Sequence, residues 1–286
     1  MANLKEIRNR ISSVSSTMQI TSAMKMVSAA KLKKAQDAIT AMRPYADKLT
    51  ELLQSLSASL DADSGSTFAE NRPVNKVLVV AITSNRGLCG AFNTNIIKQC
   101  ATLTQEVYVG KQVDFIAIGK KSNDIIGKKA TIVANHSGVF DNLTFGNVAV
   151  IAEELMELFK NGSYDRIDLV YNKFKNAATQ IIMSEQFLPI VPSEGNESSN
   201  TDYIFEPSEA EIVEQLIPKS LKTQLYKAVR DSFASEHGAR MTAMHKATDN
   251  ATELRDQLKL SYNQARQAAI TNEILEIVGG AEALNN

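Results

Sequence analysis

The sequence predicts an α/β module inserted between two long terminal helices that pair antiparallel, an α/β fold combined with a long coiled coil. Apolar residues recur with helical spacing at both ends of the chain, and short apolar runs alternate with amphipathic segments in the middle. Two polar stretches, 61–73 and 192–202, separate these parts. We therefore expect an N-terminal helix over 1–60, a central module over 74–191, and a C-terminal helix over 205–286 that pairs with 1–60.

The N-terminal segment predicts one long helix, because apolar residues recur every three or four positions from Leu4 onward. The apolar stripe shifts near Ile20, as a stutter would shift it, and then resumes from Ala35 to Leu60. Pro44 lies inside this pattern. Since proline lacks the N–H that the preceding turn needs, we expect a kink or a joint there.

The middle of the chain predicts a sheet covered by helices. Apolar runs indicate strands at 76–83, 113–118, 130–135, 166–174 and 178–187. Amphipathic spacing indicates helices at 92–107, 120–128 and 146–160. Alternation of this kind is typical of α/β folds.

The C-terminal segment predicts a second long helix, from about 220 to 278, which matches the first in length and is preceded by a short helix or bend at Pro218. The predicted seam between the two helices contains small or flexible residues: Met18, Thr21, Met24, Met241, Met244, Thr248, Ser261 and Ala265. Such residues specify and stabilise packing weakly. The seam therefore suggests that a partner encloses much of the helix pair, and the alternative is an ordinary exposed coiled coil.

The segment Thr83–Asn95 (TSNRGLCGAFNTN) joins a buried strand to a helix, and a helix N-terminus after small residues can hold an anion. It has two glycines, where the dinucleotide fingerprint has three, and no Gly-Lys-Ser/Thr follows for a triphosphate. We therefore expect Gly87 and Gly90 to serve tight turns, with Asn85, Arg86 and Leu88 exposed on a loop that contacts something else.

Composition narrows the class of protein. The net charge is −1, yet residues 1–60 carry nine Lys and Arg against four Asp and Glu, whereas residues 205–286 carry nine against twelve. This contrast is compatible with pairing of the two helices, with an acidic partner, or with solvated faces. The two cysteines and three histidines form no metal-binding or catalytic pattern. The sequence contains no long apolar stretch and no signal peptide, so we expect a soluble chain without its own membrane anchor.

The chain resembles the rotor-shaft γ subunits of F-type ATP synthases over essentially its whole length. Four stretches carry the resemblance in the family's order: LKEIRNRISSVSSTMQITSAMKMVSAAKLKKAQ (4–36), TSNRGLCGAFNTN (83–95), ASEHGARMTAMHKATDNATEL (234–254) and YNQARQAAITNEILEIVGGAEAL (262–284). The resemblance implies a shaft of two antiparallel helices with a Rossmann-like module at its foot. It implies no bound nucleotide, cofactor or metal, so the chain would be a non-catalytic subunit of the H⁺-transporting ATPase complex.

The resemblance also implies a function and a set of partners. The chain would couple proton or sodium flow through the membrane c-ring to ATP synthesis or hydrolysis at the ring of α and β subunits. The ε subunit is a further expected partner, nucleic acid is not, and membrane contact is only through these partners. The absence of a transit peptide favours a peripheral place on the cytoplasmic face of a bacterial inner membrane.

Ten residues are carried over as partner contacts: Met24, Arg86, Gly87, Leu88, Cys89, Arg240, Arg266, Gln267, Thr271 and Glu273. Arg240 and Arg266 would offer forked donors to carboxylates of the ring, Gln267 and Thr271 neutral hydrogen bonds, and Glu273 an acceptor. The alternative for each is a helix-surface residue in an intrahelical pair, such as Arg266 with Glu273.

The resemblance further implies that the segment 270–284 is an apolar tip seated in an apolar sleeve. Ile270, Ile274, Ile277 and Val278 share one face, and Gly279 and Gly280 are expected to end the helix. Lys31, Lys33 and Lys34 could face acidic loops of the β subunits, a hypothesis that charge reversal would test.

Two features depart from the family. Gly238 stands where an alanine is usual, which would cost about 1 kcal/mol of helix propensity if the position is exposed. The cysteine-bearing insertion of chloroplast relatives is absent, since residues 192–202 contain no cysteine.

Two other classes of protein are alternatives: a nucleotide-dependent enzyme with helical arms and a structural coiled-coil adaptor. Neither class explains the motifs at the two ends.

Overall fold

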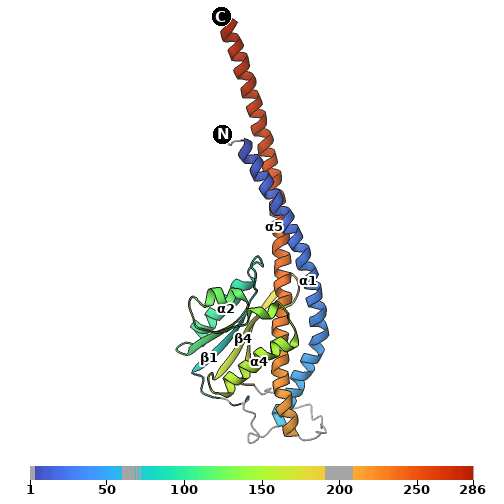
Figure 1. The fold of residues 1–286 in the computed structure, drawn as a ribbon, viewed down its shortest axis with the longest axis vertical. Coiled ribbons are helices and arrows are strands. Elements are labelled where there is room, and N and C mark those ends of the chain that lie inside the picture. The colour runs from blue at the N-terminus through green and yellow to red at the C-terminus, as the bar shows by residue number, and fades with distance from the viewer. Residues whose placement is uncertain (1–3, 60–67, 69, 71, 191–208, 286) are drawn as a thin grey trace. The chain divides into compact units, whose positions relative to one another are not determined.

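The computed structural model describes residues 4–59, 68, 70, 72–190 and 209–285. The chain forms two compact units, Met1–Ser28 with Met241–Asn286, and Ala29–Arg240. Helices α1 (Leu4–Ser59) and α5 (Glu209–Asn285) each contribute to both units (Figure 1). The division into 1–60, 74–191 and 205–286 stays a prediction, and the stretch 192–202 with most of 61–73 lies outside the described residues.

A five-stranded sheet lies at the centre of the second unit. Its strands are β1 (Lys76–Ile82), β2 (Gln112–Ile118), β3 (Ile132–Asn135), β4 (Arg166–Phe174) and β5 (Gln180–Leu188). They lie in the order β3-β2-β1-β4-β5, and β5 runs antiparallel to β4 while the other neighbours are parallel. Because β1 is central and covered on both faces, its residues after Lys76 form an unbroken apolar run. The predicted strands are confirmed.

Helices cover both faces of the sheet. One face packs Val77, Val79 and Ala81 of β1 against α2 (Phe92–Thr102) and α3 (Lys120–Ile126). The other face packs β1 against α4 (Phe145–Lys160) and against the inner part of α5. Leu221 and Leu225 of α5 are buried in this second cluster together with α4. The sequence therefore folds into the predicted α/β module, and α5 forms part of its core.

Two short elements interrupt the expected pattern. The predicted helix 92–107 ends as a π-helical turn, η2 (Leu103–Val107), in which the Tyr108 amide donates to the Leu103 carbonyl at 2.8 Å. A 3₁₀ turn, η3 (Ser137–Phe140), precedes α4. Neither has a spacing signature that separates it from an α-helix or a loop.

The inner parts of the long helices are joined through side chains. Arg43 of α1 donates to Asp231 of α5 at 3.2 Å and to the carbonyl of Phe174 at 3.1 Å. On α1, Leu32, Ala35, Ile39, Ala46 and Leu49 are buried. The predicted apolar stripe of the N-terminal helix is therefore confirmed over this part, whereas the side chains beyond Leu49 are not described.

The first unit is an antiparallel helix pair. Arg8 of α1 donates to the hydroxyl of Tyr262 at 2.7 Å, and the hydroxyls of Thr21 and Thr248 lie 2.8 Å apart. Since the contact partner falls from 262 to 248 as the α1 residue rises from 8 to 21, the helices run in opposite directions. The seam is as small and flexible as predicted, except that Ser261 is exposed.

Three expectations about the long helices are wrong. Both α1 and α5 continue through their prolines, so Pro44 marks no joint between helices and Pro218 separates no short helix from α5. The kink expected at Pro44 stays a prediction. Packing on either side of Pro218 holds the chain helical, since Ile217 and Leu221 are buried. Gly279 and Gly280 do not end α5, because Ala281 to Leu284 after them suit a helix and each glycine costs only about 1 kcal/mol. With 56 and 77 residues, the two helices do not match in length.

Candidate functional site

The loop between β1 and α2, residues 83–91, is a tightly fixed turn. Leu88 has φ 60°, and Gly90 has φ 59°. The Ser84 hydroxyl donates to the Arg86 carbonyl at 2.6 Å, and the Ser84 amide donates to the Asn93 side chain at 2.9 Å. Glycine adopts such a φ freely, whereas leucine does so at a cost. The predicted turn role of Gly90 is confirmed, while Gly87 has no positive φ and the second positive φ belongs to Leu88.

The start of α2 is used by the protein itself. The Phe92 amide donates to Cys89 at 3.3 Å, and the Asn95 amide donates to Ala91 at 2.8 Å. The Asn95 bond is the first intrahelical bond of α2, and the Ser84 amide at the start of the loop donates to the Asn93 side chain.

The crevice at the carboxyl end of the sheet is filled by α5. Ligands of doubly wound folds bind at the carboxyl ends of the strands where the strand order reverses, here between β1 and β4. Ser235 of α5 donates to the carbonyl of Asn172 at 2.9 Å, and the Asn172 side chain donates to the carbonyl of Phe92 at 3.2 Å. Ala239 packs with Phe92 and Cys89. A helix and its side chains therefore take the place that a nucleotide would occupy in such folds.

Arg240 is turned inward, which corrects the expectation that its fork faces an acidic partner. It is 7% exposed and donates to Glu236 at 2.7 Å. It also donates to the carbonyls of Arg86 and Gly87 at 3.1 and 3.3 Å. Its donors are thus used within the chain, because the adjacent turn places two backbone acceptors beside it.

Cys89 is likewise turned inward. It is 1% exposed, packs against Phe92 and Ala239, and burial raises the pKa of its thiol. By contrast, Leu88 is 64% exposed, Arg86 is exposed and Gly87 is half-buried. The tip of the RGLCG turn, residues 86–88, and Gly90 therefore remain available to another protein. Asn85, which was expected to be exposed, is half-buried, and its side chain donates to the carbonyl of Ser137 at 2.9 Å.

The remaining carried-over residues lie in the first unit. Arg266, Gln267, Thr271 and Glu273 are all exposed on α5. The Thr271 hydroxyl donates to the Gln267 carbonyl at 2.9 Å, and in the described part of α5 Arg266 and Glu273 form no ion pair with each other. Met24 of α1 is half-buried. The structure brings no two of these side chains together as a bonded cluster within the described residues; they form a displayed surface.

Apolar side chains are displayed on the last turns of α5. Ile270, Ile274, Ile277 and Val278 are 47%, 54%, 66% and 53% exposed. Leu275, which the sequence interpretation left out because it lies off that face, is 63% exposed. Lys31, Lys33 and Lys34 are exposed on α1 in the second unit. Exposed apolar residues at this density on one helix indicate a surface that another protein covers.

Gly238 is buried, so the cost stated for an exposed glycine does not apply. A Cβ at this position would lie 3.2 Å from both the Cα and the carbonyl oxygen of Ala177. The glycine lets the loop between β4 and β5 approach α5 closely. The sequence could not show this, because the two segments are far apart in the chain.

Sequence reasoning missed the polar residues buried beside Arg240. Glu236 is 8% exposed, and burial raises the pKa of its carboxyl. His237 packs edge-on against Phe233, and burial lowers its pKa to about 3, so the ring is neutral. A signal existed in the run SFASEHGAR, 232–240, where small and polar residues replace the large apolar residues of the stripe.

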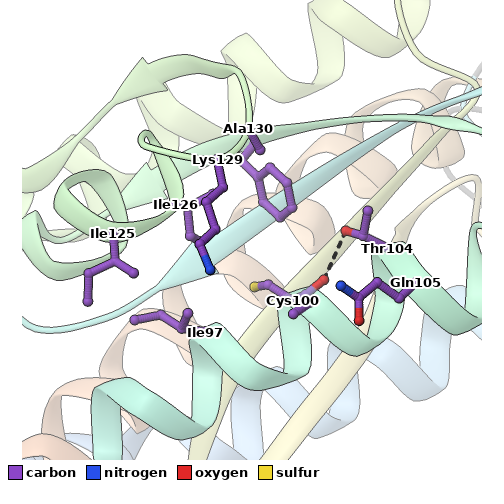
Figure 2. Close-up of a pocket in the computed structure, with 10 residues that line it drawn as sticks. Ile97, Cys100, Thr104, Gln105, Ile125, Ile126, Lys129 and Ala130 are labelled. Carbon is purple, nitrogen blue, oxygen red and sulfur yellow. Dashed lines mark hydrogen bonds between the residues drawn. The ribbon is translucent and has the colours of Figure 1, made fainter.

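A cavity of about 230 Å³ lies between α2, η2 and α3. Figure 2 shows its lining, in which Ile97, Cys100, Ile125 and Ile126 supply apolar surface. The polar side chains are those of Thr104, Gln105 and Lys129, and the Thr104 hydroxyl donates to the carbonyl of Cys100 at 3.0 Å. The cavity lies on the α2 side of the sheet and offers no convergent set of phosphate donors. Burial raises the pKa of Cys100 to about 12, so its thiol is protonated and inert.

Neither metal chemistry nor a membrane span is visible in the described parts of the chain. Among the residues that the structure describes, no group of three or more His, Cys, Asp or Glu could hold a metal ion. Within the same residues, neither long helix contains a stretch apolar enough to cross a membrane. Fold and site together define a protein with an α/β module and an antiparallel helix pair, whose exposed surfaces suit contact with other proteins.

Comparison with known proteins gives the family. The family model described as ATP synthase matches residues 3–284. The ATP synthase gamma chain of Flavobacterium psychrophilum is 73% identical over 285 residues, 99% of each chain. That of Flavobacterium johnsoniae is 72% identical over the full length of both chains, and that of a Geobacter species is 44% identical over 99% of each. The chain therefore belongs to the ATP synthase gamma chain family.

Solved structures share the fold. The chain is similar to the rotor of the Euglena gracilis mitochondrial ATP synthase, with 24% identity, a TM-score of 0.66, and coverage of 93% of this chain and 98% of that one. The central stalk of the Tetrahymena thermophila enzyme matches with 24% identity and a TM-score of 0.59, over 80% of this chain and 99% of that one. The predicted fold class is confirmed.

Proposed function

We propose that this chain is the central rotor shaft of an ATP synthase. It would couple proton or sodium flow through a membrane c-ring to ATP synthesis or hydrolysis at a surrounding ring of α and β subunits. The full-length match to ATP synthase gamma chains supports this role. The structural observation that carries it is the unpaired, exposed end of α5.

Within the described residues, that end has no opposing helix. Since Arg8 of α1 meets Tyr262, the first described residue of α1, Leu4, lies about one turn farther along α5. The C-terminal end of α5 therefore extends past α1 (Figure 1). The apolar side chains from Ile270 to Val278 are exposed on that end. A single helix with this composition needs a covering partner to bury its apolar surface. A sleeve formed by the α and β subunits would supply that cover.

Catalysis would be organised from outside the catalytic sites. An unsymmetrical shaft can favour a different conformation in each site of a ring, and it shifts each equilibrium only by its difference in contact energy between the competing conformations. The displayed residues, namely Met24, Arg86, Leu88, Arg266, Gln267, Thr271 and Glu273, are the contacts that we propose for this purpose. Gly87 contributes backbone geometry, and Cys89 and Arg240 act from within.

The finer partners and location follow from the same role. We infer contacts with the ε subunit and the c-ring, and a peripheral position on the cytoplasmic face of a bacterial inner membrane. A nucleotide-dependent enzyme is the other candidate, and the filled crevice between β1 and β4 argues against it.

The decisive experiment measures ATP hydrolysis by purified α and β subunits of the same source, with and without this chain. Strong activation that requires all three proteins, with no hydrolysis by the chain alone, supports the proposal. Hydrolysis or tight nucleotide binding by the chain alone would support the enzyme instead.

Two variants sharpen this experiment. Leu275→Asp places a charge on the displayed end of α5 and should abolish most of the activation, because the charge cannot enter an apolar sleeve without a large desolvation cost. Val109→Asp is the matched control, since Val109 is 66% exposed against 63% for Leu275 but lies beside the sheet. Equal effects of the two substitutions would contradict the proposed sleeve.

A further inference from the structure

The guanidinium of Arg240 is surrounded by acceptors of its own chain. Nη1 donates to Glu236 at 2.7 Å and lies 3.4 Å from Nδ1 of His237. Nη2 donates to the Arg86 carbonyl at 3.1 Å and to the Gly87 carbonyl at 3.3 Å, and Nε donates to the same Gly87 oxygen at 3.3 Å. With 7% of the residue exposed, no donor edge remains for an outside carboxylate.

The carbonyl oxygen of Arg86 in the loop 83–91 accepts two hydrogen bonds, one from α5 and one from the loop itself. The carbonyl of Arg86 accepts from Arg240 and also from the hydroxyl of Ser84, at 2.6 Å. These bonds fix the backbone just before Leu88, which adopts φ 60° and is 64% exposed. A leucine in the left-handed region is strained, so surrounding contacts must maintain it.

We propose that Arg240 is a positioning residue, which holds the loop 86–88 in shape and acts on partner subunits only through the exposed tip at Leu88. This inference rests on the proposed function for the identity of the partner, but the internal geometry stands without it. Arg240 thereby joins α5 to the loop, so the tip is presented in one fixed orientation.

The chemistry of arginine suits this role. Its planar fork can bond a carboxylate on one edge and two backbone carbonyls on the other, whereas a lysine ammonium is a single point charge on a flexible stem. Glu236 compensates the buried charge and orients the guanidinium. Neutral His237 adds no opposing charge.

A double-mutant cycle in the complex of α, β and this chain tests the proposal. Arg240→Lys, Leu88→Ala and the double variant are compared for ATP hydrolysis, with the thermal midpoint measured for each. If Arg240 acts through the tip, each single variant lowers the rate and the double variant is no slower than the slower single one. Multiplicative losses would show that Arg240 acts independently of Leu88 and would overturn the proposal.

The matched control is Arg266→Lys combined with Leu88→Ala. Arg266 is exposed in the first unit and has no bond to the loop, so its effect should multiply with that of Leu88→Ala. This control shows that the assay detects additive effects where they are expected.

Hydrogen exchange of the full chain supplies a measurement that does not depend on catalysis. Arg240→Lys should speed exchange of the Ser84 and Phe92 amides, which donate to Asn93 and Cys89 at the two ends of the loop, by about tenfold, because the loop loses its bonds to Arg240, while β1 and β4 keep their protection. Unchanged exchange in the loop would overturn the proposal, as would general loss of protection with no preference for the loop. Failure of the wild-type chain to activate α and β would instead count against the proposed function and leave this exchange result interpretable.

Discussion

Replacing Arg43 by methionine should lower the free energy of unfolding, because Arg43 is paired with a buried carboxylate, that of Asp231. Asp231 has a side chain that is 0% exposed, and its Oδ1 accepts from Arg43 at 3.2 Å. Its second oxygen, Oδ2, is buried without a hydrogen-bond partner among the described residues. Arg43→Met removes the hydrogen-bonded partner of this charge, leaving only the weaker attraction of Lys227 and Lys173, and also removes the bond to the carbonyl of Phe174.

The expected loss is about 3 kcal/mol in the free energy of unfolding. Removing one member of a buried pair costs about 3–5 kcal/mol, and the lower end applies because the Arg43 side chain is 39% exposed and its attraction is partly screened. Adding Asp231→Asn removes the stranded charge and should restore most of the loss. Arg255→Met is the surface control, with an expected cost below about 1 kcal/mol, because its partner Asp256 is 56% exposed.

The loss should depend on pH. Burial raises the pKa of Asp231 above its ordinary value, while Arg43 opposes this shift, so Arg43→Met raises the pKa further. The native state then binds the proton more tightly than the unfolded state. Stability from this group is present below the unfolded pKa of about 3.9 and is lost as pH rises through the native pKa. Relative to wild type, the free energy of unfolding of the variant should therefore fall little near pH 4 and by the full expected amount near pH 8.

Urea unfolding followed by circular dichroism and by tyrosine fluorescence measures this effect, since the chain has seven tyrosines and no tryptophan. A loss that is equal at pH 4 and pH 8 would refute the buried-charge reasoning. So would a double variant that is no more stable than Arg43→Met alone.

Three further outcomes are expected. Gly238→Ala should lower the thermal midpoint, because its Cβ would lie 3.2 Å from backbone atoms of Ala177. Gly279→Ala is the control, since its Cβ meets open space and should raise local helicity. A Gly238→Ala variant with a higher thermal midpoint would contradict the close approach. Cys100, with its pKa raised to about 12, should resist alkylation at pH 8 until the protein is unfolded, as mass spectrometry would show. Because the pKa of His237 is lowered to about 3, wild type should lose stability as pH falls from about 6.5 toward 3, and His237→Gln should flatten that part of the urea-midpoint profile.

The positions of the helices and strands follow from the sequence alone, because hydrophobic spacing is a local property. The strand around Val77 to Ile82 and the helix containing Val148 and Leu155 lie where their patterns predict them. The antiparallel helix pair also followed from the stripes at the two ends. The ends of the helices were less predictable, because packing around Pro218 overrides the local cost of proline.

Which polar residues face outward depends on the tertiary structure and cannot be read from the sequence. From the sequence, Arg240 and Arg266 are equivalent arginines on one helix, yet the fold brings the Arg86 carbonyl to within 3.1 Å of the first and leaves the second exposed. Gly238 and Cys89 are likewise buried by contacts with distant parts of the chain. Burial and hydrogen bonding of a side chain depend on segments far apart in the sequence, and these meet only when the long helix closes against the end of the sheet.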